Sequence, residues 1–458
     1  MALNAHSRAI ETAGKNLANV NNPAYARQRV IYGDRGTVVT PDGAQSLGLE
    51  ALGVQQLRDT LLDRQVLRES SLTASFTAEQ GGYQRAQAAL GQSIDRASGA
   101  SSTSSTGSNG LGPALDDFFN AFQSFASRPT DSGERESLLQ KAAILTDRFQ
   151  LTDSRLAQSQ TDLDSVVTSN VSDVNRLLST VADLNSQIGR FEASVPGSAV
   201  DLRDQRQARL EELAQKLPFE VRDAGGGQVQ LVAADAGGAD VVLVDHGQVQ
   251  GAVVFDGVQI TAGSPATALG LSAGAIKGAL TARDGAVQTL RADLGRLAHQ
   301  LVTSVNTAYN PTGATGDFFT ASGTTAAGLG LAASLTTASL KASDGGSAGD
   351  NTVALAIAQL ATQTFSVAGG DQFDGTFSGY YSQSVSKLGQ ALAGANARVD
   401  DQGNIEKLVR SQRDGVSGVS MDEELADLMK YQRAFQASSR VFTVIDDLLD
   451  VVVNRLGG

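Results

Sequence analysis

A glycine-rich segment around Ser347 has the residue types of a serine nucleophile. Residues 345–349 read Gly-Gly-Ser-Ala-Gly and match the G-x-S-x-G pattern of a nucleophile elbow. That elbow needs a buried strand before the serine and a catalytic histidine after it in chain order. Here the preceding residues, 342–344, are polar, and no histidine follows His299. The segment therefore favours a flexible loop, and a secreted surface hydrolase is an alternative that no triad, dyad or metal set supports.

Histidine and cysteine offer little chemistry elsewhere. Cysteine is absent, which excludes disulfides, thiolate metal sites, iron–sulfur clusters and cysteine nucleophiles. The three histidines lie far apart in the sequence, with no second ligand at metal-binding spacing: His6, His246 and His299. A solvent or packing role is the better interpretation for all three. We therefore expect no metal site and no cofactor.

Two acidic groups could be read as sites, and each has a simpler interpretation. Asp446, Asp447 and Asp450 could be paired carboxylates for acid–base catalysis, but they lie on a helix whose other face is apolar. They are typical of a charged face towards solvent or a neighbouring subunit. Residues 369–375 resemble one turn of a calcium-binding repeat, yet such sites need several stacked repeats. A surface loop is favoured there, and we expect no catalytic residue in the chain.

Composition limits the remaining functions. The 458 residues include 49 acidic and 36 basic side chains, a net charge of −13, which disfavours a nucleic-acid partner. No apolar run approaches the ~18 residues that span a bilayer, so no membrane insertion is expected, and no cleaved signal peptide is visible at the N-terminus. Only 8 residues are Pro and 49 are Gly, which leaves room for long helices joined by loops. Aromatic residues make up 5%, with no Trp, so we expect cores of Leu, Val, Ile and Ala.

Both ends of the chain predict amphipathic helices. Leu3, Ile10 and Leu17 are seven residues apart, and that helix stops before Pro23. A longer helix over residues 421–455 carries apolar residues at seven-residue spacing, in two series: Met421, Leu428, Phe435, Phe442, Leu449 and Leu456, with Tyr431, Ser438, Ile445 and Val452. One apolar stripe buries too little surface for a helix to be stable alone. We therefore predict that the two terminal helices pair as a coiled-coil stalk and become ordered on assembly.

The middle of the chain predicts a helical bundle with an inserted β domain. Two interleaved seven-residue series mark a coiled-coil seam over residues 145–191: Leu156, Leu163, Asn170, Leu177, Leu184 and Phe191, with Val167, Val174, Val181 and Ile188. A Ser/Thr/Gly tract, Ser98–Gly112, predicts a flexible connection. Residues 218–260 are rich in β-formers, and Asp256-Gly257 predicts a two-residue hairpin turn.

We therefore expect a mainly α chain with nested, discontinuous domains. The terminal helices form the stalk, a helical bundle forms the centre, and the β domain is small. The predicted divisions are 1–45 (N-terminal axial helix and extended segment), 46–217 (helical domain, first part), 218–270 (β domain), 271–414 (helical domain, second part) and 415–458 (C-terminal axial helix).

Two terminal motifs carry a resemblance to a known family. Residues 16–28 read Asn-Leu-Ala-Asn-Val-Asn-Asn-Pro-Ala-Tyr-Ala-Arg-Gln, and residues 431–438 read Tyr-Gln-Arg-Ala-Phe-Gln-Ala-Ser. Both resemble the motifs of bacterial flagellar axial proteins, the rod, hook and hook-associated proteins. The lead-in at 417–425, Ser-Gly-Val-Ser-Met-Asp-Glu-Glu-Leu, is similar to the hook-associated members at the hook–filament junction. In the middle, residues 201–206 (Asp-Leu-Arg-Asp-Gln-Arg) and Gly-Asp-Phe-Phe at 316–319 are similar to those members too.

The sequence departs from the family at two points. The family usually has Gly where Ala24 stands, so the turn there is expected to be shaped differently. Members also begin several residues upstream, so Met1 is expected to fall inside the first helix.

The resemblance implies a structural role rather than an enzymatic one: an adapter at the hook–filament junction that polymerises through its terminal helices. Another rod or hook axial protein is the alternative within the family. The implied partners are sister copies in a ring, the hook protein, a second hook-associated junction protein, and an export chaperone on the C-terminal helix. The implied route is type III export without a cleaved signal, to an extracellular position on the flagellum. The expected interface residues are Leu3, Ile10, Leu17, Asn19, Asn22, Pro23, Tyr25, Arg27, Gln28, Leu425, Leu428, Phe435, Phe442, Ile445, Leu449 and Val452.

Overall fold

The chain forms two compact units, each assembled from stretches that are not continuous in the sequence. The computed structural model describes residues 2–34, 36–40, 43–46, 49–91, 110–313, 316–347 and 349–455. Unit 1 contains Met1–Ala74, Asn170–Gly274 and Asp401–Gly458, and unit 2 contains Ser75–Ser169 and Ala275–Asp400. The class is mainly helical with a small β region, which confirms the predicted fold class. The finer five-part division stays a prediction.

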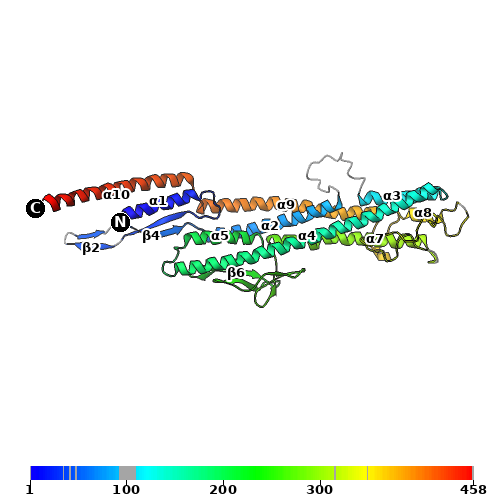
Figure 1. Cartoon of the computed structure of the whole chain (residues 1–458), viewed down its shortest axis with the longest axis horizontal. Coiled ribbons are helices and arrows are strands. Elements are labelled where there is room, and N and C mark those ends of the chain that lie inside the picture. The colour runs from blue at the N-terminus through cyan, green and yellow to red at the C-terminus, as the bar shows by residue number, and fades with distance from the viewer. Residues whose placement is uncertain are drawn as a thin grey trace. The chain divides into compact units, whose positions relative to one another are not determined.

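The two terminal helices pair in unit 1. Helix α1 spans Ala2–Ala18 and α10 spans Met421–Arg455. They run side by side and antiparallel, and α10 continues past the N-terminus of α1 (Figure 1). At ~1.5 Å per residue, α1 is about 25 Å long and α10 about 52 Å, so α1 can cover only half of its partner.

An antiparallel ribbon lies against α1. Strand β1 (Gln28–Asp34) pairs with β4 (Leu49–Gln56), with a register shift between Ile31 and Tyr32. Between them β2 (Thr37–Thr40) pairs with β3 (Gly43–Ser46). This ribbon contains the extended segment that the sequence predicts after Pro23.

The remaining β strands of unit 1 form two small antiparallel sheets after helix α5 (Val200–Ala214). The first has the order β5-β6-β7-β8, with β5 at Glu220–Gly225, β6 at Gln228–Ala234, β7 at Asp240–Asp245 and β8 at Gln248–Val249. The second has the order β11-β10-β9, with β9 at Val254–Phe255, β10 at Ile260–Ala262 and β11 at Thr267–Ala268.

The predicted hairpin at Asp256-Gly257 forms, but its turn is longer than predicted. Phe255 pairs with Ile260, so four residues connect the strands instead of two. The Asp256 carboxylate accepts the backbone N–H groups of Val258 and Gln259, both at 2.8 Å. The Asp256 side chain thus accepts the two backbone N–H groups that would form hydrogen bonds between the strands if the turn had only two residues.

Three long helices supply residues to both units: α2 (Thr60–Leu90), α4 (Ser132–Glu192) and α9 (Phe377–Ser417). On α4 the predicted seam is buried from Leu156 to Ile188, apart from Asn170. Asn170 is half-buried and accepts a hydrogen bond from Lys216 Nζ at 3.0 Å. Phe191, the last member of the series, is 60% exposed because α4 ends one residue later.

Unit 2 has an aromatic core, which corrects the expectation of aliphatic cores. Its helices are α3 (Leu111–Ser127), α6 (Gly274–Ala282), the π-turn η2 (Arg283–Val287), α7 (Gln288–Tyr309), α8 (Thr352–Gln359) and the short η3 (Val367–Gly369). Phe118 contacts Phe122, Phe318 and Phe319 with ring centroids 5.1–5.9 Å apart. Phe373 contacts Phe365 and Phe377 in the same way. A low total aromatic content does not prevent such a core, because the phenylalanines are concentrated in three short segments.

Residues 98–109 of the predicted Ser98–Gly112 connection lie outside the described residues, and so does Leu456 of the last helical series. Leu111 and Gly112 belong to α3, so the connection ends earlier than predicted. Within the described ranges, no helix has both the length and the apolar character needed to span a bilayer.

Candidate functional site

Three segments that are far apart in the sequence meet in unit 1. They are residues 16–28, residues 201–211 and residues 413–427, joined by the start of α2. We call this place the motif junction. Its members are Asn16, Pro23, Tyr25, Arg27, Gln28, Arg58, Asp63, Asp201, Asp204, Glu211, Arg413, Ser417, Glu423 and Glu424.

Asn16 closes the turn after α1. Its side chain is 1% exposed and makes four hydrogen bonds. Nδ2 donates to the Gln28 carbonyl at 2.8 Å and to Glu424 Oε2 at 3.0 Å. Oδ1 accepts from the Gln28 N–H at 3.0 Å and from the Tyr25 hydroxyl at 2.9 Å. One amide thus fixes the loop, the first strand and α10 together, which no apolar side chain could do.

Arg27 connects the same loop to the start of α10. Its Nε lies 2.7 Å from Glu424 Oε1, and its Nη1 lies 2.7 Å from Glu423 Oε2. Glu424 is 3% exposed, whereas the Glu423 side chain is largely in solvent. Burial would lower the pKa of Arg27, but the two glutamates outweigh it and raise that pKa. The acidic first turn of α10 is also favourable for the helix dipole.

Arg58 and Asp204 join the loop to α5. Arg58 Nη2 donates to Asp204 Oδ1 at 2.6 Å and to the Ala24 carbonyl at 2.8 Å, and its Nη1 donates to Asp63 Oδ2 at 2.9 Å. Burial raises the pKa of the Asp63 and Asp204 carboxyls, against the attraction of Arg58. Burial would lower the pKa of Arg58, and the two carboxylates outweigh that and raise it. The cluster is thus buried but charged and paired.

Arg413, at the end of α9, holds the same loop from the other side. Its Nη1 donates to Glu211 Oε1 at 2.7 Å and its Nη2 donates to the Pro23 carbonyl at 2.8 Å. The Arg27 N–H donates to the Ser417 carbonyl at 2.8 Å. The motif junction therefore ties both chain ends to the body of unit 1 through paired polar groups.

The predicted face of α1 is not its most buried face. Leu3, Ile10 and Leu17 are only half-buried. The buried line consists of small and polar side chains: Ala5, Ala9, Thr12, Ala13 and Asn16. Small side chains allow α1 to approach both α10 and the β1–β4 ribbon closely, so the half-buried Leu3, Ile10 and Leu17 stay a predicted interface.

The predicted stripe of α10 is divided between two environments. Leu428 and Tyr431 are half-buried, and Leu425 and Phe435 are at the border of exposure. Residues 439–453, which we call the distal half of α10, have every described side chain exposed. Phe442 is 63% exposed. The apolar members of the distal half are Val441, Phe442, Val444, Ile445, Leu448, Leu449, Val451, Val452 and Val453.

The remaining motif residues lie between α1 and β1. Asn19 Nδ2 donates to the Lys15 carbonyl at 3.0 Å, and Asn22 Oδ1 accepts the Ala24 N–H at 3.2 Å. Both are backbone-capping bonds of a tight turn. Gln28 Nε2 donates to Asp201 Oδ1 at 3.0 Å, which adds α5 to the contact.

The segments considered for catalysis contribute no residue to the motif junction. Ser347 is exposed in a loop, and the described residues immediately before it do not form a strand. His246 is exposed beside Asp245, and Asp446 and Asp447 are exposed on the distal half of α10. In the loop at 369–375, Asp371 accepts hydrogen bonds from Gln300 and from the Ser366 N–H. Among the described residues no group of three potential metal ligands comes together.

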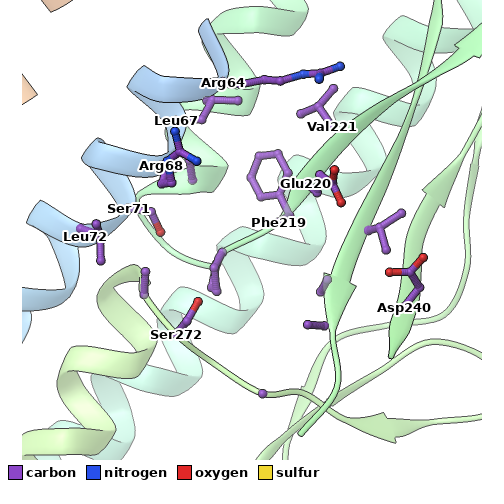
Figure 2. A pocket seen from close by; sticks show the side chains of 17 residues that line it. Arg64, Leu67, Arg68, Ser71, Leu72, Phe219, Glu220, Val221, Asp240 and Ser272 are labelled. Atoms are coloured by element: carbon purple, nitrogen blue, oxygen red, sulfur yellow. The ribbon is translucent and has the colours of Figure 1, made fainter. Parts of the chain in front are cut away.

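An apolar cavity of about 530 Å³ lies between α2 and the first sheet. Figure 2 shows Arg64 and Arg68 on the helix side and Glu220 and Asp240 on the strand side. Both carboxylates form ion pairs with Arg222, so the negative charges on the strand side are neutralised. The cavity has the shape of a binding pocket, but its lining brings no acid and base together for catalysis.

Comparisons with known proteins identify similar chains. Residues 98–319 match the model of the flagellar hook-associated protein FlgK helical domain, and residues 411–456 match the flagellar basal body rod FlgEFG protein C-terminal model. Flagellar hook-associated protein 1 of Bacillus subtilis is 24% identical over 100% of this chain and 97% of its own length. The Escherichia coli protein of that name is 23% identical, over 99% of this chain and 98% of its own.

This chain is similar over essentially its whole length to proteins named flagellar hook-associated protein 1. A solved structure, the flagellar hook junction protein FlgK from Burkholderia pseudomallei, matches with 22% identity and a TM-score of 0.44 over 54% of this chain and 43% of that chain.

The residues that the sequence analysis missed are those that hold the terminal motifs in place. Arg58, Asp204, Glu211 and Arg413 were not among the predicted interface residues, and neither was Asn16, although it begins the quoted motif. One signal is present in the sequence: the run at 201–206 resembles the family, and two of its aspartates, Asp201 and Asp204, contact the first motif. Their partners lie more than 140 residues away in the sequence, so no local pattern could pair them.

Proposed function

We propose that this chain is a structural subunit of the bacterial flagellum, placed between hook and filament. Similarity to proteins named flagellar hook-associated protein 1 over essentially the whole length is the observation that carries the proposal. The motif junction supports it, because the two terminal motifs contact one another within unit 1. A subunit built this way presents its two ends to neighbours as one element.

The two parts of the predicted interface would then have different tasks. The motif residues, including Tyr25, Arg27 and Gln28, hold α1 and α10 in one subunit. The distal half of α10 supplies the contact with other subunits, since burying each exposed Leu, Ile or Phe gains roughly 1.5–3 kcal/mol. The partners in this proposal are sister copies in a ring, the hook protein on one side, and a second hook-associated junction protein on the other.

Before assembly the same apolar surface needs protection. We place an export chaperone on the C-terminal helix, where it would cover Leu428, Phe435, Phe442 and Leu449. The chain would leave the cell through the flagellar type III channel without a cleaved signal and act outside the cell. The role is assembly, and no catalytic residue is assigned.

The test replaces four exposed apolar side chains of the distal half with serine: Phe442, Ile445, Leu449 and Val452. We expect cells that make hooks but no attached filaments and release filament subunits into the medium. A control variant changes three exposed polar residues of the same helix, Arg440, Asp446 and Asp447, to Gln, Asn and Asn, and should assemble normally. Normal filaments on the serine variant would contradict the proposal.

The alternative of another rod or hook position needs a different measurement. Antibody labelling of purified hook–basal bodies with attached filaments should mark only the boundary between hook and filament. Labelling along the rod or along the hook would replace the junction by one of those positions.

A further inference from the structure

A second cavity of about 570 Å³ lies in unit 1, next to the motif junction. The end of β4, the start of α2, α5 and the β5–β6 hairpin surround it. We call it the arginine cavity, because four arginines line it, with two aspartates: Arg58, Arg64, Arg203 and Arg206, with Asp63 and Asp223.

Arg206 is the unusual member. It is 8% exposed, and its Nη1 donates to Asn185 Oδ1 and to the Gly227 carbonyl, both at 2.8 Å. Among the described residues it has no ion pair, and its Nε and Nη2 have no hydrogen-bond partner. A buried guanidinium is ordinarily paired with a carboxylate or phosphate, since the burial of an unpaired charge is costly. Nε and Nη2 together form the planar fork that binds an oxyanion in a bidentate manner.

The other charges around the cavity are mostly compensated. Arg58 is paired with Asp63 and Asp204, and Arg203 holds Glu192 with Nε–Oε1 at 2.8 Å and Nη2–Oε2 at 2.6 Å. Asp223 lines the cavity, and its Oδ1 accepts the Gly225 N–H at 3.0 Å.

Arg64 is the second uncompensated cation. It has no ion pair with any described residue, and Figure 2 shows it leaving α2 beside Val221, which also lines the arginine cavity. Burial, together with the charges of Arg203 and Arg58 and against those of Glu192 and Asp223, lowers the pKa of Arg206 to about 10. Burial is the largest cause, because it disfavours the charged guanidinium.

The glycine turn of the hairpin makes the close approach possible. Gly226 and Gly227 have φ of +59° and +78°, which side chains disfavour. A Cβ on Gly227 would lie 2.3 Å from Glu192 Oε2 and 2.8 Å from Arg203 Nη2. Only glycine therefore lets the Gly227 carbonyl reach Arg206 and orient its free edge.

We propose that the arginine cavity binds a small oxyanion, a phosphate or carboxylate group held by Arg206 Nε and Nη2. Arg64 at the wall supplies a second cation. One bound oxyanion removes the uncompensated charge of Arg206, and the rest of the volume accommodates its hydration water.

The experiment titrates the full-length protein with sodium phosphate, and separately with sodium acetate, against sodium chloride at matched ionic strength. Calorimetry and the thermal midpoint should show saturable binding of phosphate or acetate that chloride does not reproduce. Arg206→Gln should weaken that binding at least tenfold. Arg209→Gln, on the same helix but paired with Glu212, is the control and should bind within twofold of the unsubstituted protein.

A merely structural role for Arg206 predicts a different result. Under that role, Arg206→Gln would destabilise the protein even without anion. Under the anion-binding proposal, Arg206→Gln without anion should be at least as stable as the unsubstituted protein. The reason is that the change removes an uncompensated buried charge and keeps an amide donor for the Gly227 carbonyl. Should Arg206→Gln fail to fold, Arg64→Gln on the surface of α2 should still weaken binding three- to tenfold. The proposal is wrong if both oxyanions act no differently from chloride, or if the available variants bind as the unsubstituted protein does.

Discussion

The two halves of α10 share one sequence pattern but differ in their surroundings. Residues 421–438 lie alongside α1, with Glu424 buried and ion-paired to Arg27. Residues 439–453 carry the same seven-residue apolar spacing, yet all their described side chains are exposed. The first half is therefore stabilised within the chain, and the second half has apolar surface left for a partner. The amphipathic spacing shows that the whole helix needs a packing partner. The polar contacts show that only residues 421–438 have that partner within the chain.

The largest effect should come from Glu424. Glu424→Ala leaves Arg27 without its buried partner and removes an acceptor of Asn16, which should lower the free energy of opening α1 from α10 by about 3 kcal/mol. Amide exchange of α1, followed by mass spectrometry, measures it. Glu423→Ala is the matched control, because this exposed neighbour binds the same arginine and should cost under ~1 kcal/mol. Equal effects of the two substitutions would remove the distinction between buried and exposed contacts.

Asn16 should come next. Asn16→Ala leaves the Gln28 N–H and carbonyl without their side-chain partner inside the motif junction, and we expect a loss of about 2 kcal/mol in the same measurement. Asn19→Ala removes a single, exposed hydrogen bond to the Lys15 carbonyl and should cost about 0.5 kcal/mol. A cost for Asn16→Ala no larger than for Asn19→Ala would show that the four-bond network adds nothing.

The dilute monomer should show the difference between the halves directly. We expect slow amide exchange in residues 424–438 and in α1, and fast exchange with opening free energies near zero in 439–453, which no described neighbour covers. This differs from the prediction from sequence, in which both whole ends become ordered only on assembly: here that holds for residues 439–453 alone. Strong protection of 439–453 in monomer would mean that the distal half is stable without a partner.

The sequence predicted those features of the fold that local periodicity encodes. The seam of α4 from Leu156 to Ile188 is buried because one continuous helix repeats one pattern, and the hairpin after Val254 forms because its turn residues are adjacent. The site is different. Arg58 with Asp204, and Arg413 with Glu211, are pairs whose members lie 146 and 202 residues apart. Surface and buried charges look alike in a sequence, so only the fold shows which of them pair.

The smallest predicted effect concerns pH and Glu192, which holds the end of α4 to the start of α5. Burial would raise the pKa of this carboxyl, but hydrogen bonds from Arg203 and from the backbone N–H groups of Gly197 and Ala199 outweigh it and leave the pKa below its ordinary value of 4.5. A carboxyl with a lowered pKa in the folded state contributes stability above its unfolded pKa and loses it as pH falls through the folded value. Amide exchange at α5 should therefore report a loss of stability, smaller than the effects above, as pH falls below 4.5. Glu192→Gln should flatten the dependence of α5 stability on pH. Glu212→Gln, exposed on α5, is the control and should keep that dependence. An unchanged pH dependence in Glu192→Gln would assign it to other carboxyls.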